Sequence, residues 1–153
     1  MSLPFSFMDA EIRTFAAAAL LAMAVPASAQ KLPVAQLNAG MHVVRAEVAA
    51  DFASRSRGLM HRKSLAPNSG MLFIFDDAAI HCMWMKNTYI PLSVAFVDEA
   101  GTIVSISDME PHSEQTHCAA RPALYALEMT RGWFAQRGIK AGMKLGGLDK
   151  LRR

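Results

Sequence analysis

The sequence lacks the marks of several large protein classes. It has two cysteines and no C-x-x-C pair, and no apolar run in it approaches the roughly 18 residues of a membrane-spanning helix. No block of five like charges occurs, and a formal net charge of +3 over 153 residues is small. The strings G-x-S-x-G and H-E-x-x-H, the P-loop and the dinucleotide-binding fingerprint are also absent. These absences argue against thiol–disulfide catalysis and against a transmembrane helix. They also argue against a nucleic-acid partner and against the best-known enzyme classes.

What remains is the composition of one folded domain. Hydrophobic residues make up 52% of the chain and charged residues 19%, which excludes a disordered or fibrous protein. A chain of this length has room for one hydrophobic core and little more.

The first 29 residues have the pattern of a signal peptide. Residues 15–25 form an apolar run that Arg13 precedes, and the small residues Ala27 and Ala29 follow it. A short apolar run before an A-x-A string is typical of a cleaved export signal. We therefore expect cleavage near Ala29 and a periplasmic or extracellular protein. An uncleaved anchor and an alanine-rich helix of the domain are the alternatives.

Cys82 and Cys118 both lie in the expected mature chain. An even number of cysteines in an exported protein favours a disulfide. That bond would close a loop of 37 residues and stabilise the fold by about 4 kcal/mol if chain entropy dominates. Two free thiols are the alternative, because the sequence does not show whether the side chains come within bonding distance.

Apolar stretches predict about seven short strands. Alternation indicates half-buried strands, and continuous apolar runs indicate strands buried on both faces. The expected strands span residues 41–48, 71–75, 80–86, 92–98, 102–106, 123–129 and 143–145.

Two short helices are expected between these strands. Asp51 is placed to cap a helix that ends near Gly58 or His61. Thr130 is placed to cap a second helix over residues 132–137.

The remaining segments complete a single domain. Residues 30–40 are expected to be a loose lead-in, residues 111–122 a long loop and residues 149–153 a charged tail. The predicted fold class is mainly β, an antiparallel sandwich or barrel with two short helices over residues 41–153. An α+β fold is the alternative.

Three strings in this chain resemble one family. They are Arg57-Gly58-Leu59-Met60, Gly70-Met71-Leu72-Phe73-Ile74-Phe75, and Trp84-Met85-Lys86-Asn87-Thr88-Tyr89-Ile90-Pro91-Leu92. In this order they resemble the proteins catalogued as domain of unknown function 192, over nearly all of the mature chain. The resemblance implies a small β-rich domain, exported or membrane-tethered in many members, with no established activity.

Two positions depart from the pattern of that family. Ser93 and Met143 stand where the resemblance implies an aspartate. Any chemistry that these acids carry out in relatives would be absent from this chain, which lowers the expectation of an enzyme.

The polar part of the third string is a candidate ligand site. Trp84 supplies an aromatic surface, and Lys86, Asn87 and Thr88 supply a cation, an amide and a hydroxyl, which suit a small polar ligand. Such residues also commonly bond to the backbone at strand ends or face water, and that is the structural alternative.

Glu128 is the second candidate, because it stands in an otherwise apolar strand. Alternation places its carboxylate on one face with Leu124 and Ala126, where it must pair with a cation or take a raised pKa. Lys86 and Arg57 are the natural partners by type. A structural ion pair is favoured over a site acid.

Copper binding is a third candidate. Alternation along the expected strand 80–86 places His81, Met83 and Met85 on one side, and imidazole and thioether ligands suit Cu(I). Methionine also fills irregular cores, which is the more common role.

We therefore expect an exported binding or accessory module rather than an enzyme, with no cofactor indicated. Its small polar ligand would contact Trp84, Lys86, Asn87 and Thr88, and a second wall would contain Glu128, Arg57 and Met60. A hydrolase or transferase that uses Glu128 as acid and base is the first alternative, and a periplasmic copper-binding protein is the second.

Overall fold

The structure is a computed structural model that describes residues 31–151. The expected signal peptide lies outside the described residues. Within them, no helix is long and apolar enough to cross a lipid bilayer.

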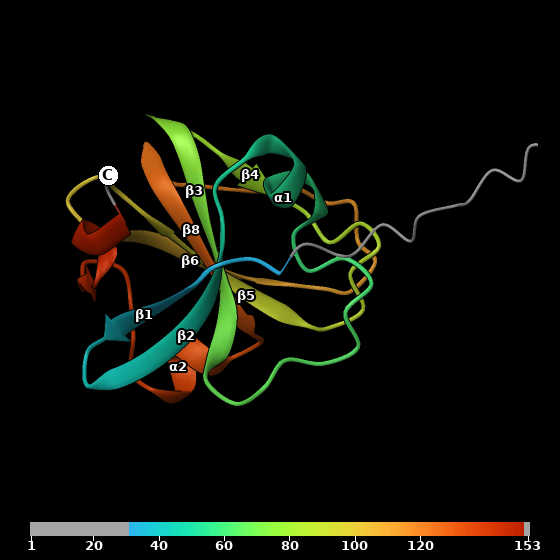
Figure 1. Ribbon diagram of the computed structural model, residues 1–153, viewed down its shortest axis with the longest axis horizontal. Helices are drawn as coiled ribbons and strands as arrows, with labels where there is room; N and C mark the ends of the chain where they lie inside the picture. The colour runs from blue at the N-terminus through green and yellow to red at the C-terminus, as the bar shows by residue number, and fades with distance from the viewer. Residues whose placement is uncertain (1–30, 152–153) are drawn as a thin grey trace, which may run out of the picture. The chain divides into compact units, whose positions relative to one another are not determined.

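One seven-stranded sheet dominates the described chain, in the strand order β6-β5-β8-β3-β2-β1-β9 (Figure 1). Every neighbouring pair is antiparallel except β2 and β3, which run parallel. The strands are β1 (Val34–Ala39), β2 (His42–Ala49), β3 (Ser69–Ala79), β5 (Leu92–Val97), β6 (Ile103–Met109), β8 (Ala123–Thr130) and β9 (Leu145–Gly146).

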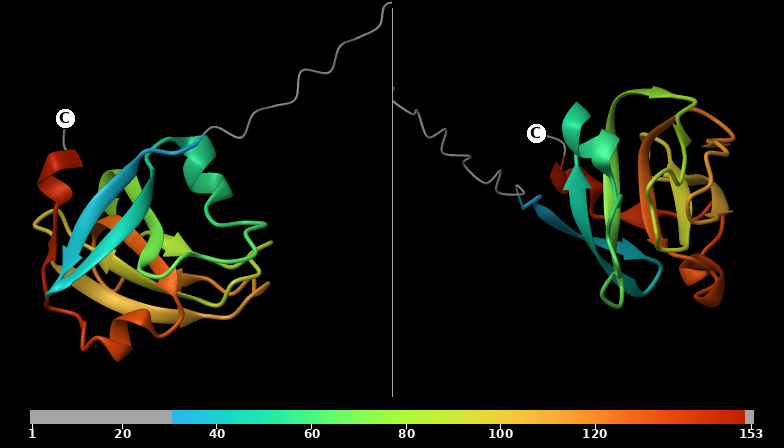
Figure 2. Two further views of the ribbon diagram at one scale, coloured as in Figure 1. Left: turned by 60° about the horizontal axis from the view of Figure 1, so that its bottom comes forward. Right: turned by 90° about the vertical axis from the view of Figure 1, so that its right-hand side faces the viewer.

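The sheet curls into a half-barrel (Figure 2). A bridge between Thr102 and Lys144 links the start of β6 to the segment that leads into β9, so the two edges of the sheet meet at one end. The mainly-β prediction is confirmed, and the curled sheet is closer to the barrel than to the sandwich.

The parallel pair follows from the connection between β2 and β3. The chain crosses through helix α1 (Phe52–Arg57) before it re-enters the sheet. Asp51 caps α1 in a capping box with Ser54, as the sequence predicted in part. The second helix, α2 (Trp133–Gln136), is also present, but its N-cap is Gly132 and no side chain caps it. The expected cap by Thr130 is wrong.

Two apolar clusters lie on the two faces of the sheet. Side chains from strands near both edges, including Leu37 of β1 and Ile103 of β6, meet in the first cluster, which therefore lies inside the curl. The second cluster lies on the outer face of β3, β5 and β8, where Leu59, Met85 and Ile90 cover it. Strand β5 is consequently buried along its whole length.

The ends of the domain differ from the prediction. The lead-in was expected to be loose, but Val34–Ala39 form β1, whose alternate residues are buried against β2. The expected charged tail instead starts with a 3₁₀ helix, η1 (Leu148–Leu151), anchored by buried Leu148.

The expected strand over residues 80–86 is mostly wrong. Only β4 (Cys82–Met83) forms, and it pairs with β7 (His117–Cys118) from the segment expected to be a loop. Alternation in burial nevertheless continues along this segment, with residues 81, 83 and 85 more buried than 82, 84 and 86.

Candidate functional site

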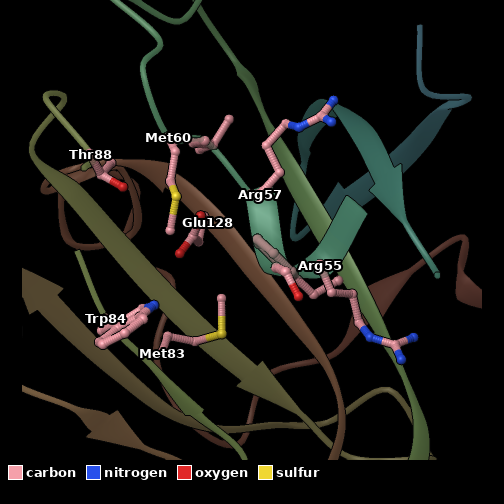
Figure 3. A pocket seen from close by; sticks show the side chains of 11 residues that line it. Arg55, Arg57, Met60, Met83, Trp84, Thr88 and Glu128 are labelled. Carbon is pink, nitrogen blue, oxygen red and sulfur yellow. The ribbon is translucent and has the colours of Figure 1, made fainter. Parts of the chain in front are cut away.

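A pocket opens on the outer face of the sheet, between helix α1 and strand β4. Its volume is about 270 Å³, part of which is open to solvent. Its walls come from α1 and the turn after it, from β3, from β4 with the residues that follow, and from β8 (Figure 3). The lining residues are Arg55, Ser56, Arg57, Gly58, Leu59, Met60, Phe73, Met83, Trp84, Thr88 and Glu128.

Glu128 lies in the middle of this group. It belongs to β8, where its neighbours across the sheet are Met71 of β3 and Val94 of β5. Central strands hold it in place, and only 3% of the residue is exposed. The picture of the pocket shows its carboxylate among the side chains of Met60, Met83 and Trp84 (Figure 3).

The carboxylate of Glu128 has no partner among the described residues. No hydrogen bond or ion pair to it is formed there, and burial alone raises its pKa to about 8. Every fully sealed side-chain nitrogen or oxygen in residues 31–151 has a hydrogen-bond partner. A carboxylate without one must therefore keep contact with solvent, and the pocket provides that contact.

The two cations expected to pair with Glu128 lie elsewhere. Lys86 Nζ is 3.6 Å from Glu114 Oε1 and lies over the ring of Trp84, 5.2 Å from its centroid. Arg57 lines the pocket, but its guanidinium points away from Glu128 (Figure 3). The expected structural ion pair is wrong, and Glu128 is left as a free acid in a pocket.

Arg55 brings a further positive charge to the rim, and that charge is already balanced. Its Nη2 is 2.7 Å from Asp76 Oδ2, and its Nη1 donates to the carbonyls of Ala50 and Ile74. Arg55 therefore links α1 to β3. Because Asp76 balances its charge, Arg55 does not neutralise Glu128 inside the pocket.

The structure separates the polar residues of the third string. Trp84 and Thr88 line the pocket, whereas Lys86 and Asn87 do not. Thr88 is 4% exposed, and its hydroxyl donates to the carbonyl of Lys86 at 3.2 Å. Asn87 has φ 54°, a left-handed backbone that asparagine tolerates, and its carbonyl accepts from His61 N–H at 2.9 Å. Thr88 makes the side-chain bond to the backbone that the structural alternative describes, whereas Lys86 contacts Glu114 and Trp84, and Asn87 contributes a backbone carbonyl.

The turn that carries these residues is fastened from two sides. His61 and His112 both have φ 62°, and His112 N–H donates to the carbonyl of Thr88 at 3.1 Å. Their imidazoles flank Tyr89, whose hydroxyl lies 3.1 Å from His61 Nδ1. These contacts hold the turn, and with it Trp84 and Thr88, at the edge of the pocket.

Met83 lines the pocket, although the sequence pattern suggested it as a copper ligand of a different site. It was grouped with His81 and Met85 as a copper ligand set, and the three do not converge. His81 stacks on Phe75 and its Nε2 lies 2.9 Å from the carbonyl of Asp77, while Met85 is fully buried in the outer cluster. The alternation along the sequence that placed residues 81, 83 and 85 on one side already indicated the inward direction of Met83, and their burial agrees with it.

Ser93 and Met143 lie away from the pocket. Ser93 pairs with Met129 across the sheet, so it shares the face of Met129 rather than that of Glu128. Its buried hydroxyl donates to Asp108 and accepts from Gly132 N–H. Met143 packs against the inner cluster. The departures from the family pattern therefore do not remove any group from this pocket.

Cys82 and Cys118 form a disulfide. Of the two alternatives that the sequence left open, a disulfide or two free thiols, the first is therefore confirmed. The two residues are directly opposite each other in the β4–β7 ladder. The bond fixes the segment that follows β4, which carries Trp84 to the pocket.

The comparisons with known proteins identify the family but no activity. The family described as "Uncharacterized ACR", domain of unknown function 192, matches residues 34–147. No curated protein matches the sequence.

Two solved structures are similar over most of the chain. One is a protein of Sinorhizobium meliloti 1021 described as a proposed transcription regulator, 37% identical, with a TM-score of 0.70 over 75% of this chain and 92% of that one. The other, from Novosphingobium aromaticivorans DSM 12444, is described as a protein of unknown function; it is 34% identical, with a TM-score of 0.72 over 79% of this chain and 89% of that one. The chain therefore belongs to the family of domain of unknown function 192.

Proposed function

We propose that this protein is an exported binding module whose pocket takes a small ligand that brings a hydrogen-bond donor or a positive charge to Glu128. The observation that carries the proposal is the buried carboxylate of Glu128, which has no partner among residues 31–151. Leaving a buried polar group unpaired costs about 1–3 kcal/mol, and more for a charged one. A ligand that donates to the carboxylate would remove that cost.

The size of the pocket limits the ligand. Pockets for drug-sized molecules usually span about 300–1,000 Å³, whereas the space inside this pocket that a small molecule can occupy is about 40 Å³. The ligand that fits is an ion or a molecule of a few heavy atoms. Trp84, at 44% exposed, would cover it from the solvent side.

The three strings through which this chain resembles the family support the same site. Met60 of the first string, Phe73 of the second and Trp84 of the third all line this one pocket. Segments far apart in the chain thus meet where Glu128 has no partner.

Export is supported by two features. The first 29 residues have the composition of a signal peptide, and the Cys82–Cys118 disulfide suits an oxidising compartment. Both features support a periplasmic or extracellular location for the mature protein.

A hydrolase or transferase built on Glu128 is the second candidate, because a carboxyl whose pKa is about 8 is poised for proton transfer near neutral pH. Among the residues that line the pocket there is no histidine to complete an acid–base pair. Binding therefore ranks above catalysis.

The test is a thermal-shift titration of the full chain with methylammonium, acetamide and glycerol. Binding to the folded state raises the melting temperature, by an amount that grows with the logarithm of ligand concentration above the Kd. We expect at least one probe to do so, and Glu128→Gln to abolish the effect.

The matched control is Glu114→Gln, the same chemical change at an exposed carboxylate outside the pocket. It should respond to the probes as the native protein does. A melting temperature that no probe raises, or that rises equally in Glu128→Gln, would contradict a site for a small organic ligand at this pocket.

A further inference from the structure

We infer that the ligand of this pocket is a soft monovalent metal ion, Cu(I), held between the thioethers of Met60 and Met83 and the carboxylate of Glu128. The inference rests on the proposed function and names its ligand class. It uses Met83 with partners other than His81 and Met85, which the fold holds apart from it.

The two thioethers reach the pocket from different elements. Met60 belongs to the turn after α1, and Met83 belongs to β4. Figure 3 shows both side chains directed toward Glu128, from opposite sides of its carboxylate. Thioethers from two separate walls and one carboxylate thus line the same small pocket.

The chemistry of these donors selects the ion. Thioether sulfur is a soft ligand that favours Cu(I), whereas Mg²⁺ and Ca²⁺ prefer sets of oxygen atoms. Zinc sites use combinations of cysteine, histidine and carboxylate, and residues 31–151 contain no group of three or more of those side chains that could hold a metal. Two thioethers with one carboxylate therefore point to Cu(I) over the harder cations.

The charges of the side chains around the pocket agree with a single monovalent ion. Glu128 supplies one negative charge once the incoming ion has displaced its proton to the solvent. Arg55 is balanced by Asp76, and the guanidinium of Arg57 is directed away from the carboxylate. One Cu(I) would neutralise the buried carboxylate without leaving excess charge. An organic ammonium would also neutralise it, but would gain no bond from the sulfur atoms.

The test uses Ag(I), a stable probe for Cu(I) sites, added to the full chain in chloride-free buffer. Thiol reductants are left out, so that the disulfide stays intact and no free thiolate competes for the metal. The chain has two tryptophans, and Trp133 is buried in the inner cluster away from the pocket. A Trp133→Phe background therefore makes the fluorescence of Trp84 a local reporter.

We expect one equivalent of Ag(I) to quench that fluorescence. The double variant Met60→Leu/Met83→Leu, which keeps side-chain volume but removes both sulfur atoms, should weaken binding at least tenfold. Glu128→Gln should weaken it as well. The matched control is Met41→Leu/Met85→Leu, one methionine 89% exposed and the other buried in the core, neither in the pocket. This control should bind as the native protein does.

A second arm uses Cu(I) kept reduced by ascorbate, in competition with a chromogenic Cu(I) chelator. It should show the same order among the variants. The inference is overturned if the Met60→Leu/Met83→Leu protein binds Ag(I) as tightly as the native chain. It is equally overturned if no Ag(I) binds or if Glu128→Gln has no effect.

The two proposals can fail separately. If methylammonium or acetamide binds in a Glu128-dependent way while Ag(I) does not, the pocket is a ligand site and its ligand is not a soft metal. If neither kind of probe depends on Glu128, both proposals fail. Single variants at Met60 and Met83, checked by urea unfolding, keep the test valid should the double variant unfold.

Discussion

Replacing Glu128 by glutamine should stabilise the protein at neutral and alkaline pH. Glutamine has nearly the shape of a protonated glutamate but cannot ionise. Because the native carboxyl is buried and has no partner in the described part of the chain, the cost of ionising it should disappear in the variant.

The magnitude follows from the shift in pKa. Burial raises the pKa of Glu128 from its ordinary 4.5 to about 8, so the folded state holds this proton more tightly than the unfolded state does. Below the unfolded pKa the carboxyl is protonated in both states and the variant gains nothing. Stability of the native protein then falls as pH rises between the two values. At about 1.4 kcal/mol per unit, the loss is about 3 kcal/mol at pH 7 and about 5 kcal/mol above pH 8.

The measurement is urea unfolding of the native chain, Glu128→Gln and Glu114→Gln at pH 5, 7 and 9. Comparing differences between proteins cancels the titration of every other group. The Glu128→Gln advantage should grow by several kcal/mol from pH 5 to pH 9, while Glu114→Gln should track the native protein. An advantage that stays flat across this range would show that the carboxyl ionises freely, and the account of the pocket given above would then be wrong.

Three further perturbations probe the fold around the pocket. Removing the disulfide with a Cys82→Ala/Cys118→Ala variant should lower the free energy of unfolding by about 4 kcal/mol, measured in urea. Gly70→Ala should prevent normal folding, seen as lost near-UV circular dichroism, because a Cβ there would collide with the backbone of β8. Asn87→Gly should leave both stability and ligand binding nearly unchanged, because glycine also adopts the left-handed backbone of this turn; a loss of binding would restore Asn87 as a ligand residue.

Much of the sheet could be predicted from the pattern of apolar residues. The strand and the strand pairing that this pattern failed to predict have physical explanations. The hairpin of β5 and β6 follows from two strong strand signals around a glycine turn. Strand β1 was missed because its buried residues are two small alanines and one leucine, which give a weak hydrophobic signal. The parallel pairing of β2 and β3 cannot be derived from local periodicity, since it depends on where the crossover through α1 returns the chain.

The candidate site, too, could be predicted from the sequence only in part. Glu128 could be found because a single carboxylate in an apolar strand breaks the pattern of its neighbours. That Glu128 has no ion-pair partner within the described residues could not be predicted from the sequence, because this depends on where Lys86 and Arg57 point after folding. The face assigned to it was also only partly right. Leu124, expected beside Glu128, packs against the inner cluster where the ladder between β3 and β8 is irregular.

The contacts distinguish residues that the fold needs from residues that it does not. Thr88 satisfies a carbonyl and Met85 fills the outer cluster, so each has a structural reason for its place. Glu128 has no such reason: it accepts no bond within residues 31–151, and its ionised form destabilises the sheet that holds it. An apolar residue would serve the packing of β8 better. A buried carboxylate that faces an open pocket, lined by thioethers and an indole, is what the proposed ligand would account for and the packing of the sheet does not.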